Sequence, residues 1–299
     1  MTRRAAGVAL ALLPACVWTA AVIPQERFRS TAEMVVVDVL VMDGRRVVTG
    51  LTAADFELFD SGVPQTIREL YLDELPMTVI MVLDTSGSVE GERLEALRRA
   101  ALALFDRLRP GDRAAVMTFS HRLRMPEDVT PDVARLRTAV AALQAGGATA
   151  LRDAAYAGLA LTGAEAGRTL LLLFTDGVDT ASLLDDERVL SMARHSSATV
   201  YAVATRELPD VKLWGPSAPP ATDDRFVTSL AQQTGGRVMY AEGNRDIGPA
   251  FERVLAEFKS RYVLGYTPAG VSGRGWRPVD VRLTKRRGTV LARRGYFAE

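Results

Sequence analysis

The stretch Met77-Thr-Val-Ile-Met-Val-Leu-Asp-Thr-Ser-Gly-Ser88 decides the fold. Its run of apolar and β-branched residues has no polar interruption before Asp84, which is typical of a strand buried on both faces of a parallel sheet. Asp84, Ser86 and Ser88 then carry oxygen atoms at alternate positions of a turn that precedes a long amphipathic helix. Open α/β sheets bind their ligands at this end of a strand, so the turn is predicted to carry the functional site.

Two segments further along the chain complete this pattern. Gly146-Gly-Ala-Thr149 opens a second helix, and Leu170-Leu-Leu-Leu-Phe-Thr-Asp176-Gly177 is a second buried strand that ends in an aspartate. Together with Asp84-Thr-Ser86-Gly-Ser88, in this order and spacing, they resemble the metal-ion-dependent adhesion site of von Willebrand factor type A (VWA) domains. The flanking segments resemble a bacterial group of exported, VWFA-related proteins.

The resemblance implies a metal site with defined roles for its members. Ser86 and Ser88 would bind the ion directly through neutral hydroxyl groups, and Asp84, Thr149 and Asp176 would reach it directly or through water. A donor set of oxygen atoms favours a hard cation, so Mg²⁺ is expected, with Mn²⁺ or Ca²⁺ as substitutes. Hydroxyl ligands leave much of the ion's charge uncompensated, and in the family a Glu or Asp of a partner protein completes the coordination.

Each of these residues also has a purely structural interpretation. Ser86, Ser88 or Thr149 alone would cap a helix or stabilise a turn, and Asp176 followed by glycine is an ordinary turn pair. Their occurrence in one order, each at the same end of the expected sheet, favours the metal site.

Composition and the first residues indicate the compartment. With 299 residues, 48% hydrophobic, and a formal net charge of +1, the chain has no charge excess that would indicate nucleic-acid binding. Arg3-Arg4, an uncharged run to Val22 and small residues near Ala21 predict a signal peptide over residues 1–21, and hence a periplasmic or secreted protein. Leu13-Pro-Ala-Cys16 resembles a lipoprotein motif, which leaves a lipid anchor on Cys16 as an alternative.

The remaining chain is predicted to form an α/β Rossmann-like VWA domain within a small β-sandwich. Residues 22–75 and 261–299 show strand patterning, whereas strands and helices alternate over residues 76–260. This alternation predicts a mostly parallel central sheet with helices on both faces and a short antiparallel edge strand near residues 123–129. The two β segments are expected to assemble one sandwich from both ends of the chain; two separate small β units are the alternative.

Two further features bear on partners. The proline-rich stretch 206–224, with Trp214, follows a strand and should emerge at the metal end of the sheet, where Trp214 and His121 are candidate partner-binding residues; an insertion without function is the alternative. Basic residues near the C-terminus form either a solvated strand face or a contact with anionic envelope polymers or phospholipid. These residues are Arg282, Lys285, Arg286, Arg287, Arg293 and Arg294.

The function expected from these features is non-enzymatic, metal-dependent protein binding in the bacterial cell envelope. A metal-assisted hydrolase is an alternative, but it requires a general base. Only His121 is a candidate among the two histidines, because His195 lies in a helix and is expected at its surface. A VWA scaffold whose ion only stiffens the loops is the third hypothesis.

Overall fold

A computed structural model describes residues 34–72, 75–162, 167–176, 178–205 and 224–298. The expected signal peptide, Cys16 and Trp214 lie outside these residues. None of the helices in the described part of the chain is long and apolar enough to cross a membrane.

The central sheet has six strands in the order β11-β10-β9-β6-β7-β8. Every residue of β6, β9 and β10 is buried, which explains why these strands appear in the sequence as continuous apolar runs. Only β8, at the edge, is antiparallel to its neighbour, as predicted. The strand bounds are β6 Met77–Asp84, β7 Arg113–Phe119, β8 Leu123–Thr130, β9 Arg168–Thr175, β10 Thr199–Thr205 and β11 Val238–Ala241.

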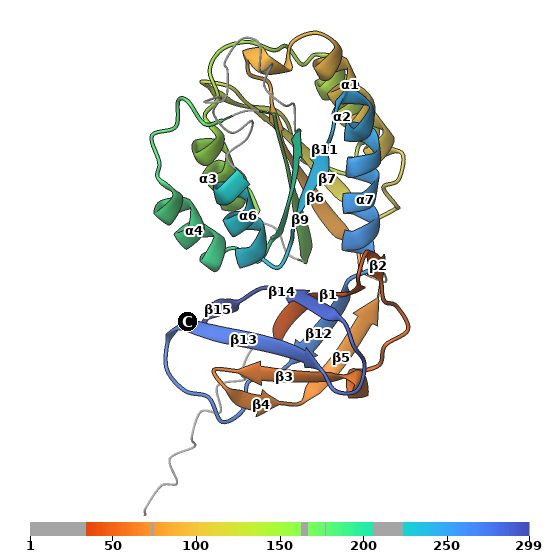
Figure 1. Cartoon of the computed structure of the whole chain (residues 1–299), viewed down its shortest axis with the longest axis vertical. Coiled ribbons are helices and arrows are strands. Elements are labelled where there is room, and N and C mark those ends of the chain that lie inside the picture. The colour runs from red at the N-terminus through yellow and green to blue at the C-terminus, as the bar shows by residue number, and fades with distance from the viewer. Residues whose placement is uncertain (1–33, 73–74, 163–166, 177, 206–223, 299) are drawn as a thin grey trace, which may run out of the picture. The chain divides into compact units, whose positions relative to one another are not determined.

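Helices cover both faces of this sheet (Figure 1), each through an apolar side. One layer consists of α1, α2 and α7, and the other of α3, α4 and α6. α1 is the long amphipathic helix predicted after the Asp84 turn, and its apolar residues Leu94, Leu97 and Leu104 are buried. The helix bounds are α1 Glu92–Phe105, α2 Val133–Ala141, α3 Leu151–Thr162, α4 Asp186–His195, α6 Asp224–Gln233 and α7 Ile247–Lys259.

Strands from both ends of the chain build one β-sandwich, as predicted. β1 pairs antiparallel with β12, so that Val37 lies opposite Leu264. The sheet β14-β1-β12-β5, with the short β2 beside β1, shares an apolar core with the sheet β15-β13-β3-β4. The exact domain boundaries stay predictions. The strand bounds are β1 Val35–Asp43, β2 Arg46–Val47, β3 Phe56–Asp60, β4 Val63–Gln65, β5 Ile67–Leu72, β12 Tyr262–Tyr266, β13 Gly275–Leu283, β14 Thr289–Ala292 and β15 Gly295–Ala298.

A fully buried arginine joins the sandwich to the central sheet. Arg261, which follows α7, donates to the Tyr201 hydroxyl on β10 at 3.2 Å. Its Nη2 donates to the carbonyl oxygens of Asp38 on β1 and Leu291 on β14, at 2.9 and 3.0 Å. One guanidinium group therefore bonds to three strands that lie far apart in the sequence.

The C-terminal basic residues lie in different surroundings, because most of them are exposed but Arg293 is not. Arg293 is half-buried, and its Nη2 donates to the Ser196 carbonyl oxygen at 3.0 Å, just beyond the end of α4. The carbonyl groups at the end of a helix lack partners within the helix and attract a cation. Burial lowers the pKa of Arg293. Arg282 forms an ion pair with Asp280, while Lys285 and Arg287 are exposed.

Candidate metal centre

Asp84, the first acidic residue of the site, lies at the carboxyl end of β6, next to the carboxyl end of β9. The two strands are parallel, with Leu83 opposite Phe174, so both end at the same edge of the sheet. One Asp84 oxygen accepts a hydrogen bond from the Ser86 backbone N–H, and the other accepts one from the Thr175 hydroxyl, each at 2.9 Å. Both carboxylate oxygens are thus held in place by their neighbours.

Hydroxyl groups connect the two serines to the second carboxylate. The Ser86 and Ser88 Oγ atoms lie 3.0 Å apart, and the Ser88 hydroxyl donates to Asp176 Oδ1 at 2.8 Å. Asp84, Ser86 and Asp176 are buried. Four of the five residues predicted to bind metal are therefore joined by a continuous series of hydrogen bonds.

Backbone contacts bring the loop of Thr149 to the same turn. The Gly87 N–H donates to the Gly147 carbonyl oxygen and the Gly146 N–H to that of Thr85, each at 2.9 Å. Thr149 is buried, and its own N–H donates to the Thr180 hydroxyl at 3.0 Å. Among the described residues, its hydroxyl group forms no hydrogen bond with the other four, so the loop is joined to the site through its backbone.

His121 lies against this loop rather than among the metal-site residues. Gly147 has φ +89°, and a Cβ atom placed there would fall 2.1 Å from His121 Nδ1. The imidazole therefore occupies the space that a side chain at residue 147 would need. His121 is exposed, and its Nδ1 lies 3.5 Å from the Ser120 hydroxyl oxygen.

Arg93, which was not among the predicted site residues, contacts the candidate metal centre. It lies in the first turn of α1, donates to the Ser88 carbonyl oxygen at 3.0 Å and forms an ion pair with Asp176 Oδ2. Arg93 lies five residues after Ser88, at the start of the helix that follows the site, and this position could have indicated the contact. The guanidinium group compensates the negative charge of Asp176.

Burial determines the pH at which Asp84 ionises. It raises the pKa of Asp84 to about 6, and the negative charge of Asp176 adds to the rise, whereas hydrogen bonds from Ser86 and Thr175 oppose it. Below this pH the carboxyl group is largely protonated. A divalent cation beside it would favour the ionised form.

The donor set fits a hard cation. In the part of the chain that the structure describes, no group of three or more His, Cys, Asp or Glu residues comes together. The Asp84 turn offers instead two carboxylates and the hydroxyl groups of Ser86 and Ser88, with Thr149 on the adjoining loop. Oxygen donors of this kind suit Mg²⁺, Mn²⁺ or Ca²⁺. Arg93 already occupies one oxygen of Asp176, which leaves Oδ1 facing Ser88.

Arg93→Gln is expected to raise the affinity of the protein for Mg²⁺. The substitution removes the positive charge of Arg93, which lies beside Asp176. In the wild-type protein this charge would repel Mg²⁺ from the site. Because the pair is partly shielded from solvent, the gain should be about three- to tenfold, or about 1 kcal/mol. Isothermal titration calorimetry with MgCl₂ measures it, and Arg99→Gln, an exposed arginine of the same helix, is the matched control. An unchanged or lower affinity would show that Arg93 orients Asp176 rather than competing with the metal.

With this geometry established, comparison with known proteins identifies the fold. Residues 79–178 match the family model described as the von Willebrand factor type A domain. The chain contains a VWA domain. The match begins in β6 and ends just beyond Asp176, so it includes all five predicted metal-binding residues.

Relatives with similar sequences are longer proteins. The uncharacterized protein sll0103 of Synechocystis is 31% identical over 174 residues, which are 54% of this chain and 41% of that protein. Human inter-alpha-trypsin inhibitor heavy chain H4 is 26% identical over 145 residues, covering 44% of this chain and 16% of that protein. The chain thus spans less than half the length of these relatives.

Solved structures with this fold have diverged further in sequence. A von Willebrand factor type A protein from Catenulispora acidiphila superposes with a TM-score of 0.54 at 13% identity, covering 83% of this chain and 74% of that one. Proximal thread matrix protein 1 from the mussel byssus superposes with a TM-score of 0.52 at 15% identity, covering 64% of this chain and 48% of that one. At these identities the likeness concerns the fold of the VWA domain alone.

Proposed function

We propose that this protein is a non-enzymatic recognition module that binds a partner protein through a divalent cation. Asp84, Ser86, Ser88, Thr149 and Asp176 would hold the ion, with Mg²⁺ as the first choice. The observation that carries the proposal is the series of hydrogen bonds from Asp84 through the two serines to Asp176, at the carboxyl end of a VWA domain sheet.

The chemistry of the site explains why the ligand should be acidic. A bound cation supplies a Lewis-acidic position, and the serine hydroxyls do not neutralise its charge. Arg93 further reduces the negative charge that Asp176 contributes. The centre as a whole would therefore attract a carboxylate, which a Glu or Asp side chain of a partner supplies. The expected export of the chain would place this interaction in the bacterial cell envelope.

Metal binding is tested directly with the Ser86→Ala/Ser88→Ala double variant. Calorimetry should show Mg²⁺ binding to the wild-type protein and none to the variant, since both direct hydroxyl ligands are lost. Thr85→Val is the matched control, because the Thr85 hydroxyl donates to the Phe119 carbonyl oxygen at 3.1 Å rather than to the metal-site residues. No Mg²⁺ or Mn²⁺ binding by the wild-type protein would refute the proposal.

Partner capture separates recognition from a structural role for the ion. A pull-down from envelope extract should recover a protein in Mg²⁺ that is released by EDTA, and the double serine variant should not recover it. If that variant only melts at a lower temperature and still captures the same protein in EDTA, the ion stiffens the loops and the recognition hypothesis fails.

A further inference from the structure

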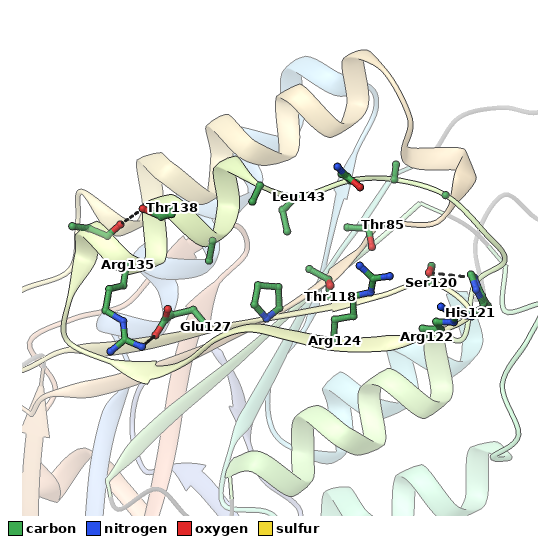
Figure 2. A pocket seen from close by; sticks show the side chains of 17 residues that line it. Thr85, Thr118, Ser120, His121, Arg122, Arg124, Glu127, Arg135, Thr138 and Leu143 are labelled. Carbon is green, nitrogen blue, oxygen red and sulfur yellow. Dashed lines mark hydrogen bonds and ion pairs between the residues drawn. The ribbon is translucent and has the colours of Figure 1, made fainter.

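A groove lies directly beside the candidate metal centre. It is a cavity of about 640 Å³, within the range of small-molecule and peptide sites, between β8, α2 and the loop that follows α2. Thr85, which stands between Asp84 and Ser86 in the metal-site turn, lines one end of it (Figure 2). Gly146, whose N–H donates to the Thr85 carbonyl oxygen, also lines this end. The groove and the metal centre therefore share one turn of the chain.

Two arginines line this groove, Arg124 on the edge strand β8 and Arg122 just before that strand begins. Side chains alternate between the two faces of a strand, and Arg122, Arg124 and Pro126 are all lining residues. Leu123 and Met125 lie between them and are 41% and 38% exposed. Figure 2 shows Arg124 extending from β8 toward Thr85 and Thr118.

The charges of these two arginines are not compensated within the described part of the chain. Neither Arg122 nor Arg124 forms an ion pair there, and both are exposed. Glu127 is the only acidic residue among those that line the groove, and it is held by Arg135 at 2.7 Å at the far end. The end nearest the metal centre therefore carries a net positive charge.

We infer that the groove binds a second carboxylate of the ligand, so that the ligand is an acidic peptide segment with two carboxylate side chains. This inference rests on the proposed function, because the first carboxylate is the one that the cation would take. Guanidinium groups pair with carboxylates through two parallel hydrogen bonds, a geometry that ammonium groups lack. Thr118 and Thr138 add hydroxyl groups along the same groove. Two anchor points would make binding selective for the spacing of the acidic residues.

The test uses the full chain and labelled synthetic peptides in a glutamine background. One peptide carries a single glutamate, and a series carries two glutamates separated by one to five residues. Fluorescence anisotropy in Mg²⁺ should show that at least one spacing binds about tenfold more tightly than the single-glutamate peptide. Arg122→Gln/Arg124→Gln should remove this advantage while calorimetry shows unchanged Mg²⁺ binding. Arg287→Gln, an exposed arginine of the sandwich, controls for net charge.

Several outcomes would overturn the inference. The inference fails if all the peptides bind with equal affinity, or if none binds at millimolar concentration. It also fails if the two-glutamate peptides keep their higher affinity for the double arginine variant, or lose it equally for the Arg287→Gln control. Failure of the proposed function has a different signature. In that case Mg²⁺ does not bind in calorimetry, and EDTA leaves the anisotropy of every peptide unchanged.

Discussion

Asp84→Asn is expected to stabilise the metal-free protein at neutral pH and to abolish its stabilisation by Mg²⁺. The pKa of Asp84 rises from its ordinary value of 3.8 to about 6 because the side chain is buried. A carboxyl group with a raised pKa stabilises the fold below about pH 4, and this contribution disappears as the pH rises through about 6. At neutral pH the loss amounts to about 3 kcal/mol.

Asparagine should remove this penalty without breaking the local hydrogen bonds. Its amide oxygen can accept from the Ser86 N–H, as Asp84 does, and its amide N–H can donate to the Thr175 hydroxyl oxygen. We therefore expect a gain of about 1 to 3 kcal/mol in the free energy of unfolding at neutral pH, and no gain at about pH 4. Urea denaturation in EDTA at both pH values measures it.

Asp176→Asn is the matched control and should act in the opposite direction. Asp176 is paired with Arg93, and its side chain is fully covered. Loss of the carboxylate removes the anionic partner of the Arg93 guanidinium group, at a cost of about 1 to 3 kcal/mol. If both substitutions destabilise the metal-free protein equally, the raised pKa of Asp84 does not govern its stability.

Arg261→Leu is expected to be the most destabilising single substitution described here, at about 3 to 5 kcal/mol. The guanidinium group is fully buried and donates to the Tyr201 hydroxyl and to two backbone carbonyl groups. Leucine can satisfy none of them, and each buried polar atom left unpaired costs about 1 to 3 kcal/mol. Arg261→Lys should recover only part of the loss, since one ammonium group cannot reproduce the planar fork.

Urea denaturation followed by tryptophan fluorescence and by circular dichroism tests this expectation. Because Arg261 joins the central sheet to the sandwich, the two signals should separate into two transitions in the variant and coincide in the wild type. Arg282→Leu removes an exposed arginine and is expected to change the stability by less than about 1 kcal/mol. A loss in Arg261→Leu no larger than in this control would contradict the role assigned to Arg261.

The fold could be predicted because its strongest signals are local. The three fully buried strands are unbroken apolar runs, and the helices between them show apolar spacing that matches one covered face. Strand patterning at both ends of the chain predicted that the two segments share one sandwich, and the pairing of β1 with β12 is where they meet. The surroundings of Arg261 and Arg293 could not be predicted. The residues next to an arginine in the sequence do not show whether its guanidinium group contacts solvent or a buried carbonyl group.

The candidate site could be predicted only in part for a similar reason. Its acidic and hydroxyl residues follow buried strands or open a helix, and their positions in the sequence indicate that they meet. The contact of Arg93 with Asp176 depends on how α1 lies against the end of β9, and the groove of Arg122 and Arg124 depends on the space between β8 and α2. Packing between elements determines both, and packing has no short sequence motif.

The pairing of β1 with β12 also constrains how the protein is made. Val37 meets Leu264 only after more than two hundred intervening residues have been synthesised, whereas the central sheet pairs strands that are closer in sequence. Until then the valine-rich first strand has no neighbour on that side and exposes hydrogen-bonding groups that other chains can pair with. Newly made chains are thus more exposed to aggregation until the β12 segment has been synthesised, so we expect a chaperone to bind β1 during this interval.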